Sequence, residues 1–340
     1  MKTALARPLL LVGIALLLLI VGQTAMPGFL SAGQIGNQLK IAAFLGIFGL
    51  CQTIVIAAGG QGLDLSVGAN ATLGGLLGAA IMHGSNGMTA PGLLAALAAG
   101  LTTGTLNGVG IAVMRVPPLV ATLAMTSVVD GAVIAGVGML HPSNAASPAL
   151  VWMAGWSSAG MPNVVVIWAA LAAVAVWLLS ASAWGKRLEA TGANPTAALL
   201  SGTNTQAVRI TAYALSGALA AFGGFMLTGY VGQAFFGLGD PYILTSIVVA
   251  TIGGASLVGG RAPYFGVICG AIMMTVLVSL LTALTIGEAG RQIIFGATLL
   301  AFLGLDRVLK GRLLGPLFGR LRRAAPLPTT ASAPDPSSGG

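Results

Sequence analysis

Long apolar runs separated by short polar segments fill most of this chain. Ten runs come close to the ~20 residues that a helix needs to cross a bilayer, and they cover residues 9–26, 41–58, 67–83, 92–113, 119–140, 163–183, 209–230, 243–258, 264–285 and 292–309. The third and eighth runs are short, so counts of eight or nine spans also stay open. The ~10-residue alternating segments of a membrane β-barrel are absent. The pattern therefore predicts an all-α integral membrane protein with about ten transmembrane helices.

The composition agrees with a membrane protein and excludes several other classes. Hydrophobic residues make up 56 % of the 340 residues, whereas only 6 % are charged. A soluble domain carries about 25 % charged residues, so this chain has too few charges to cover a water-facing surface. We therefore exclude a soluble enzyme, a nucleic-acid-binding protein and a disordered chain. We expect the protein to be embedded in a lipid bilayer.

The basic residues gather at three places, which predicts the orientation in the membrane. Eleven of the 15 stand before the first run, in the polar segment 184–209 or from the end of the last run onward: Lys2, Arg7, Lys186, Arg187, Arg209, Arg307, Lys310, Arg312, Arg320, Arg322 and Arg323. Membrane proteins retain Lys and Arg on the cytoplasmic side. Both termini and segment 184–209 are therefore expected in the cytoplasm, with Lys40, Asp240, Glu288 and Arg291 outside. The predicted location is the cytoplasmic (inner) membrane.

The chain divides into a membrane domain and a tail. Residues 1–310 are predicted to form one polytopic transmembrane domain, and residues 311–340 a basic and then Pro/Ser/Gly-rich cytoplasmic tail that cannot bury a core. The first run resembles a signal peptide, but residues 23–25 fit a small-residue cleavage site poorly. We favour an uncleaved first span.

Small residues recur every four positions in several runs. The fourth run carries such a stripe, the seventh carries another over 216–232, and the ninth carries Gly266 and Gly270. Helices in lipid associate through close packing of small residues, because lipid supplies no hydrophobic drive between them. The glycines expected to pack helices are Gly100, Gly104, Gly108, Gly253, Gly254, Gly259 and Gly260.

Polar residues interrupt the apolar pattern between the second and third runs. Asp64 and Ser66 stand where the third helix begins, and their oxygens are suited to accept hydrogen bonds from its unpaired N–H groups. We favour this capping role over substrate contact, although a broken helix in a transporter also lines the path. Asn70 and Asn107 lie within runs. We expect them to hydrogen-bond across helices, with contact to the substrate path as the alternative.

Asp130 is the acidic residue that lies deep in a long run. An ionised carboxylate at the bilayer centre costs about 2.5–3.5 kcal/mol or more, which makes such a residue a functional candidate. Two hypotheses stand side by side. In one, Asp130 accepts hydrogen bonds from substrate hydroxyl groups in a transport path; in the other, it packs between helices against backbone or a polar neighbour. No spacing of His, Cys or acidic residues predicts a metal site.

Segment 184–209 is the one sizeable polar stretch on the predicted inner side. Its sequence predicts a short helix over 197–200 that Pro195 opens and Gly202 ends. Asn194 or Thr191 is placed to cap that helix. Such a helix packs either on a soluble partner or on the lipid surface.

Four segments resemble, in order, the motifs of a known family. Residues 59–69 resemble the GGIDLSVGA motif of the permease subunits of ABC-type sugar importers, the ribose-type carbohydrate-uptake family. The other three segments are 104–123, 192–202 and 252–261. Together they cover most of residues 40–310, so the likeness extends over nearly the whole membrane domain.

The resemblance implies a fold and a set of partners. It implies a type II ABC importer-like permease with glycine-rich broken helices, paired with a second copy or a paralogue. A separate ATP-binding subunit would hold ATP and Mg, so the chain itself would carry no cofactor and would not be an enzyme. An extracytoplasmic solute-binding protein would deliver a monosaccharide or related polyol. The coupling positions would be Gly192, Asn194, Pro195, Ala198, Ser201, Gly202 and Asn204.

The chain departs from the family pattern at two places, and three alternatives stay open. Ile243 and Thr245 stand where ribose-branch members often carry acids, and Asp130 stands where a basic residue often precedes a glycine. One alternative is a permease for branched-chain amino acids or nucleosides, and another is an ion-coupled secondary transporter, which needs membrane carboxylates. The third is an intramembrane protease suggested by the GxGD run 237–240, which needs a second embedded carboxylate.

Overall fold

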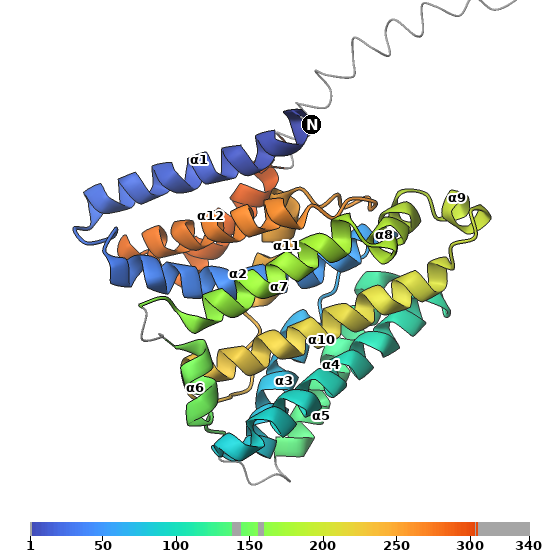
Figure 1. Ribbon diagram of the computed structural model, residues 1–340, viewed down its shortest axis with the longest axis horizontal. Helices are drawn as coiled ribbons and strands as arrows, with labels where there is room; N and C mark the ends of the chain where they lie inside the picture. Colours follow the sequence, from blue (N-terminus) through green and yellow to red (C-terminus); the bar gives the residue numbers. More distant parts are fainter. Residues whose placement is uncertain (1, 138–143, 156–159, 303, 305–340) are drawn as a thin grey trace, which may run out of the picture. The chain divides into compact units, whose positions relative to one another are not determined.

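A computed structural model describes residues 2–137, 144–155, 160–302 and 304 (Figure 1). Residues 1–296 form one compact unit, and residues 297–340 form a second. In the second unit the described residues, 297–302 and 304, are helical. The predicted tail, residues 311–340, lies outside the described residues.

The described part of the chain is almost entirely helical, as the hydropathy pattern predicted. Its helices are α1 (Lys2–Ala25), α2 (Ala32–Ala57), α3 (Val67–Met82), η1 (Asn86–Met88), α4 (Thr89–Ala112), α5 (Pro118–Val137), α6 (Pro148–Ala154), α7 (Asn163–Ser180), α8 (Ala183–Ala193), α9 (Pro195–Leu200), α10 (Thr205–Val231), α11 (Tyr242–Gly253) and α12 (Tyr264–Ala283). Residues 288–302 are also helical.

Within the described residues, seven helical segments are long and apolar enough to cross a membrane. They are α1, α2, η1 with α4, α5, α7, α10 and α12. The two short runs of the sequence are the two shorter apolar helices, α3 with 16 residues and α11 with 12. The tenth run begins within helix 288–302, and its expected end at 309 lies outside the described residues.

One expectation about the second span was wrong. The helix begins at Ala32 rather than near 41, because Ser31 caps it by accepting a hydrogen bond from the Gln34 N–H. The polar residues before 41 therefore extend the helix instead of forming a loop. Lys40 lies within α2, is 8 % exposed, and has its Nζ 6.0 Å from the centre of the Tyr230 ring.

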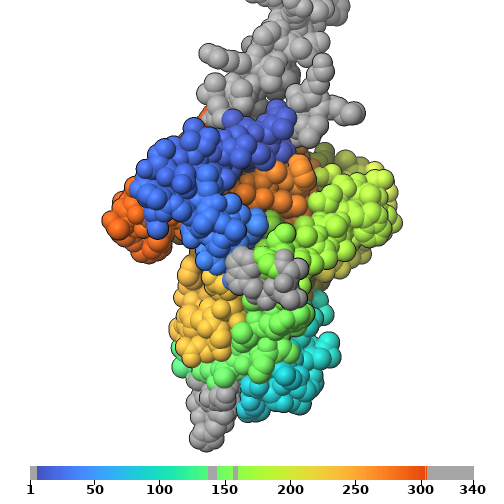
Figure 2. Space-filling model, turned by 60° about the vertical axis from the view of Figure 1, so that its left-hand side comes forward, coloured from blue at the N-terminus to red at the C-terminus, as the bar shows by residue number. Residues whose placement is uncertain are grey.

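The core is built around α2 and α10, whereas α1 and α5 are peripheral. In α2, 89 % of the most apolar window is buried, compared with 22 % in α1 and 17 % in α5. Figure 1 shows α10 running beside α4, and α3 contacts both helices. Figure 2 shows α1 (blue) on the surface, and α12 (orange) contacts it. A helix that remains mostly uncovered in the single chain faces lipid or another subunit.

Glycine contacts bring the central helices close together. A Cβ on Gly100 or Gly104 would overlap the carbonyl oxygen of Gly217 or Tyr213 in α10, and one on Gly108 would lie 2.7 Å from Ile210 Cα. A Cβ on Gly253 at the end of α11 would lie 2.5 Å from Val267 Cα in α12. Such approaches leave no room for a side chain.

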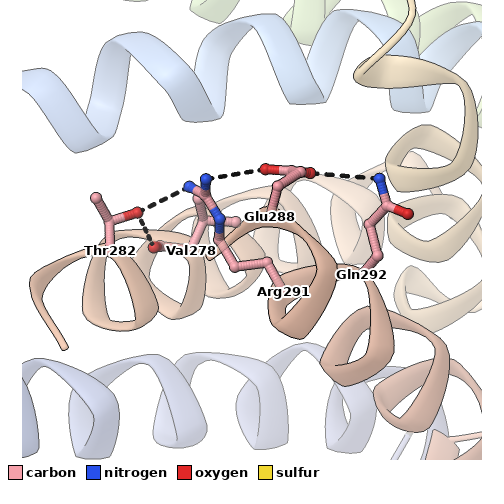
Figure 3. Close-up of polar contacts among 5 residues, drawn as sticks. All are labelled: Val278, Thr282, Glu288, Arg291 and Gln292. Carbon is pink, nitrogen blue, oxygen red and sulfur yellow. Dashed lines mark hydrogen bonds and ion pairs between the residues drawn. The ribbon is translucent and has the colours of Figure 1, made fainter. Parts of the chain in front are cut away.

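A polar cluster joins α12 to helix 288–302 (Figure 3). Arg291 lies 2.9 Å from the Glu288 carboxylate and donates a hydrogen bond to the Thr282 hydroxyl at 3.1 Å. Gln292 donates to Glu288 at 3.5 Å. Glu288 is 63 % exposed, and an exposed ion pair stabilises a fold only slightly. The cluster therefore positions the turn without dominating its stability.

Candidate functional site

The chain stops being helical between α2 and α3 because three successive residues adopt the left-handed region. Gly59, Gly60 and Gln61 have φ angles of +79°, +69° and +57°. Glycine reaches this region without steric cost, so the first two positions suit the break. The chain then runs through Asp64 to Ser66 before α3 begins.

The carboxylate of Asp64 is completely buried at this helix break. Its Oδ1 accepts hydrogen bonds from the Ser66 N–H at 3.0 Å and the Ser66 hydroxyl at 2.5 Å. Its Oδ2 accepts from the Ser216 hydroxyl of α10 at 2.8 Å. A buried carboxylate is tolerated only when such donors replace water.

The backbone of Asp64 is held from the other side by α2. The Gln52 side chain donates from Nε2 to the Asp64 carbonyl at 2.6 Å and accepts from the Asp64 N–H at 3.3 Å. Gln52 is also fully buried. This two-point contact fixes the position of the break against the most buried helix.

Ser66 connects the break to α3 and α4. Its hydroxyl accepts hydrogen bonds from Asn70 Nδ2 at 3.1 Å and from Asn107 Nδ2 at 2.9 Å. Thr103 in turn donates to Asn70 Oδ1 at 2.5 Å. The structure therefore brings Asp64, Ser66, Asn70 and Asn107 into one buried cluster, which we call the Asp64 cluster.

The capping roles expected for Ser66 and Asp64 at this helix break have different outcomes. Ser66 makes no side-chain cap for α3, because its hydroxyl oxygen accepts from the amide groups of Asn70 and Asn107 instead. Asp64 does accept from the N–H of Ser66, and its side chain is completely buried. Sequence reasoning missed Gln52 and treated Ser216 only as a small residue; a hydroxyl within a small-residue stripe was the available signal.

Asp130 lies apart from the Asp64 cluster, on the peripheral helix α5. It is partly buried, and the adjacent Val129 together with Val133 packs against a small core cluster that includes Ala234. Ala234, in the segment after α10, therefore lies beside α5, which is mostly uncovered.

The predicted short cytoplasmic helix is α9. Asn194 caps it by accepting a hydrogen bond from the Ala197 N–H at 3.0 Å, Pro195 occupies its first turn, and Gly202 follows with φ +83°. Of the two proposed capping residues, Asn194 takes this role and Thr191 is buried in α8. The preceding helix α8 was not expected from the sequence.

The outer face of α9 is apolar and uncovered. Leu199 and Leu200 are 61 % and 85 % exposed, whereas Ala198 is buried. Asn204 then caps α10 by accepting from the Ala207 N–H at 3.0 Å. In the described part of the chain, no group of three His, Cys, Asp or Glu side chains is placed to hold a metal ion.

Comparison with known proteins relates these features to transport systems. The family model described as "Branched-chain amino acid transport system / permease component" matches residues 34–303. The galactose/methyl galactoside import permease protein MglC of Salmonella typhimurium is 31 % identical over 312 residues, which are 84 % of this chain and 90 % of the relative.

Two further relatives carry other substrates in their names. The fructose import permease protein FrcC of Rhizobium meliloti is 30 % identical over 260 residues, 73 % of this chain and 70 % of the relative. The autoinducer 2 import system permease protein LsrC of Escherichia coli is 28 % identical over 321 residues, 91 % and 90 % of the two chains. No solved structure matches the chain.

Proposed function

The chain belongs to the family of branched-chain amino acid transport system permease components, and from this premise we propose that it is the membrane permease of an ATP-driven sugar importer. The observation that carries the proposal is the 31 % identity to a galactose import permease across 90 % of that relative. The multi-pass helical fold supports it. The substrate is a monosaccharide or related polyol.

The proposed mechanism divides the work among several chains. A separate ATP-binding subunit binds ATP and Mg and hydrolyses ATP, and an extracytoplasmic solute-binding protein delivers the sugar. This chain pairs with a second copy or a paralogue and makes no covalent bond with the substrate. It carries no cofactor of its own.

We propose the cytoplasmic membrane as the location, with both termini inside. The support is the distribution of Lys and Arg, which predicts the inner side for segment 184–209. On that side, α9 presents Leu199 and Leu200 to a partner. We assign to this surface the docking of the ATP-binding subunit, with Gly192, Asn194, Pro195, Ala198, Ser201, Gly202 and Asn204 as the coupling positions.

The substrate path is proposed to run along α5 at Asp130. A carboxylate in the middle of a membrane helix must face protein or water, because contact with lipid is costly. Since α5 is mostly uncovered, this surface is available to line a path with a second permease. Asp64, Ser66, Asn70 and Asn107 border the path indirectly in this scheme, by holding the helix break in place.

One experiment tests the function. The permease is reconstituted in liposomes with its ATP-binding subunit and its solute-binding protein, and uptake of labelled galactose and fructose is measured with and without ATP. ATP-dependent sugar uptake that needs all components is expected. Uptake without the ATP-binding subunit, driven by an ion gradient, would establish a secondary transporter instead.

A second substrate class is favoured by one observation, the description of the matching family as a branched-chain amino acid permease. Leucine is therefore included as a labelled substrate in the same assay, and adenosine is added to test the nucleoside alternative. ATP-driven uptake of one of these two compounds, without uptake of the sugars, would identify that compound as the substrate instead of a sugar.

A further inference from the structure

Three segments that are far apart in the sequence meet backbone to backbone beside α8. They are the turn after α2 with Gly59, the end of α8 with Gly192, and the loop between α11 and α12 with Gly260. The Gly260 N–H donates a hydrogen bond to the Ala57 carbonyl at 3.0 Å. Figure 1 shows the loop between α11 and α12 reaching α8. We call this meeting point the glycine joint.

The glycine joint has no room for side chains. A Cβ on Gly192 would overlap the Ala57 carbonyl oxygen and lie 2.5 Å from Gly260 N. A Cβ on Gly59 would lie 2.6 Å from Gly192 Cα, where real Cβ atoms keep more than 3.0 Å. The contacting atoms are backbone, so no flexible side chain is available to move aside.

Glu189 adds a second connection between the same segments. Its Oε1 accepts a hydrogen bond from the Ala262 N–H at 3.0 Å. Glu189 stands three residues before Gly192, so both contacts lie on one face of α8. The loop between α11 and α12 is therefore attached to α8 at two points.

The glycine joint lies between α9 and the Asp64 cluster. On one side, Asn194 ends α8 and caps α9, which begins three residues after Gly192. On the other side, Asp64 follows Gly59 by five residues along the same break. Backbone packed at this density transmits a displacement instead of absorbing it.

We propose that the glycine joint transmits movement of α9 to the helix break that holds Asp64, with Gly192 and Glu189 as its positioning residues. This inference rests on the proposed function, because it takes α9 as the docking site of the ATP-binding subunit. The joint makes α8–α9, the Asp64 break and the loop between α11 and α12 move as one body. ATP-driven displacement of α9 then shifts the break between α2 and α3.

Hydrogen exchange of the full-length permease in lipid nanodiscs tests the mechanical part. Gly192→Ala places a methyl group into the joint, and Gly185→Ala is the matched control, because its Cβ would overlap α7 carbonyls at the other end of α8. We expect Gly192→Ala to speed amide exchange over residues 59–66 and 256–262 by roughly tenfold, as loss of a buried hydrogen bond does. The proposal is wrong if amide exchange over residues 59–66 and 256–262 is unchanged in Gly192→Ala. It is also wrong if Gly185→Ala speeds exchange in these segments equally.

Coupling in the reconstituted complex tests the functional part, with galactose as the probe. Glu189→Ala serves as the second variant, because it removes a side-chain contact without inserting bulk. We expect galactose transported per ATP hydrolysed to fall by roughly fivefold in both Gly192→Ala and Glu189→Ala, while ATP hydrolysis continues. A normal ratio of galactose transported to ATP hydrolysed in both variants would refute the coupling role of the glycine joint and leave the proposed function standing. Absence of ATP-driven uptake by the wild-type complex would instead refute the proposed function, and the coupling role with it.

Discussion

The hydroxyl of Ser216 donates a hydrogen bond to the carboxylate of Asp64 across 2.8 Å, although the two residues are 152 positions apart. Both side chains are fully buried. The bond connects the middle of α10 to the break between α2 and α3. Because an unpaired polar group in the core is costly, each of these residues requires the other in the folded protein.

We therefore expect Ser216→Ala and Asp64→Ala to destabilise the protein. Ser216→Ala removes one donor from a buried carboxylate and should cost about 1–3 kcal/mol. Asp64→Ala leaves several donors without an acceptor and should cost more, with Asp64→Asn between the two. Thermal unfolding in detergent measures the order. The control is Ser127→Ala, whose exposed hydroxyl bonds only within α5; an equal loss in this control would contradict the assignment.

Gly104→Ala is expected to lower the melting temperature, whereas Gly110→Ala is not. Both glycines lie in α4, but a Cβ on Gly104 would overlap the Tyr213 carbonyl oxygen, and a Cβ on Gly110 meets no atom within 4 Å. Overpacking of this kind costs about 1–3 kcal/mol. Alanine is otherwise the better helix former. Equal melting temperatures for the two variants would mean that α4 and α10 separate easily.

The short helix α9 is predicted to depend on its cap. Asn194→Ala removes the acceptor for the Ala197 N–H and should destabilise the helix by about 1 kcal/mol. Asn194→Asp retains an oxygen at this position and serves as the control. If α9 docks the ATP-binding subunit, sugar-stimulated ATP hydrolysis falls in the alanine variant and is retained in the aspartate variant. Full stimulation in both variants would place the contact elsewhere.

The sequence predicts features that depend on neighbouring residues or on the thickness of the bilayer, and it does not predict contacts between distant segments. The apolar runs located the helices because a bilayer imposes their length, and α9 was predictable because Asn194 and Pro195 act on neighbouring residues. The partner of Asp64 was not predictable, since Ser216 reaches it only after α10 has packed. Similarly, Lys40 reads as a loop residue by its charge, yet it lies in α2 because Ser31 starts the helix earlier.

The orientation in the membrane predicts which loops a reagent reaches from outside. A cysteine at Ser201 should not react with an impermeant maleimide in intact cells, and it should react after permeabilisation, because the loop after α9 is expected inside. A cysteine at Ser85, between α3 and α4, is the matched control on the outer side. The native Cys51 and Cys269 are buried, so their background reaction should be low. Labelling of Ser201→Cys from outside would reverse the topology.

Asp130 provides the test that separates a transport path from helix packing. At 1.5 Å per residue it lies roughly 18 Å along α5 from Pro118, which we expect to be near the middle of the membrane. A carboxylate accepts hydrogen bonds from sugar hydroxyls about twice as strongly as a neutral group.

If Asp130 faces the path, Asp130→Asn should weaken galactose uptake markedly at an unchanged melting temperature, and Asp130→Leu should abolish uptake. If Asp130 packs between helices, both variants should melt at lower temperature, and Asp130→Asn should keep most of its uptake. Glu288→Gln removes an exposed acid elsewhere and controls for charge alone. Near-normal uptake by Asp130→Asn together with a lowered melting temperature would therefore remove Asp130 from the path and leave it as a packing residue.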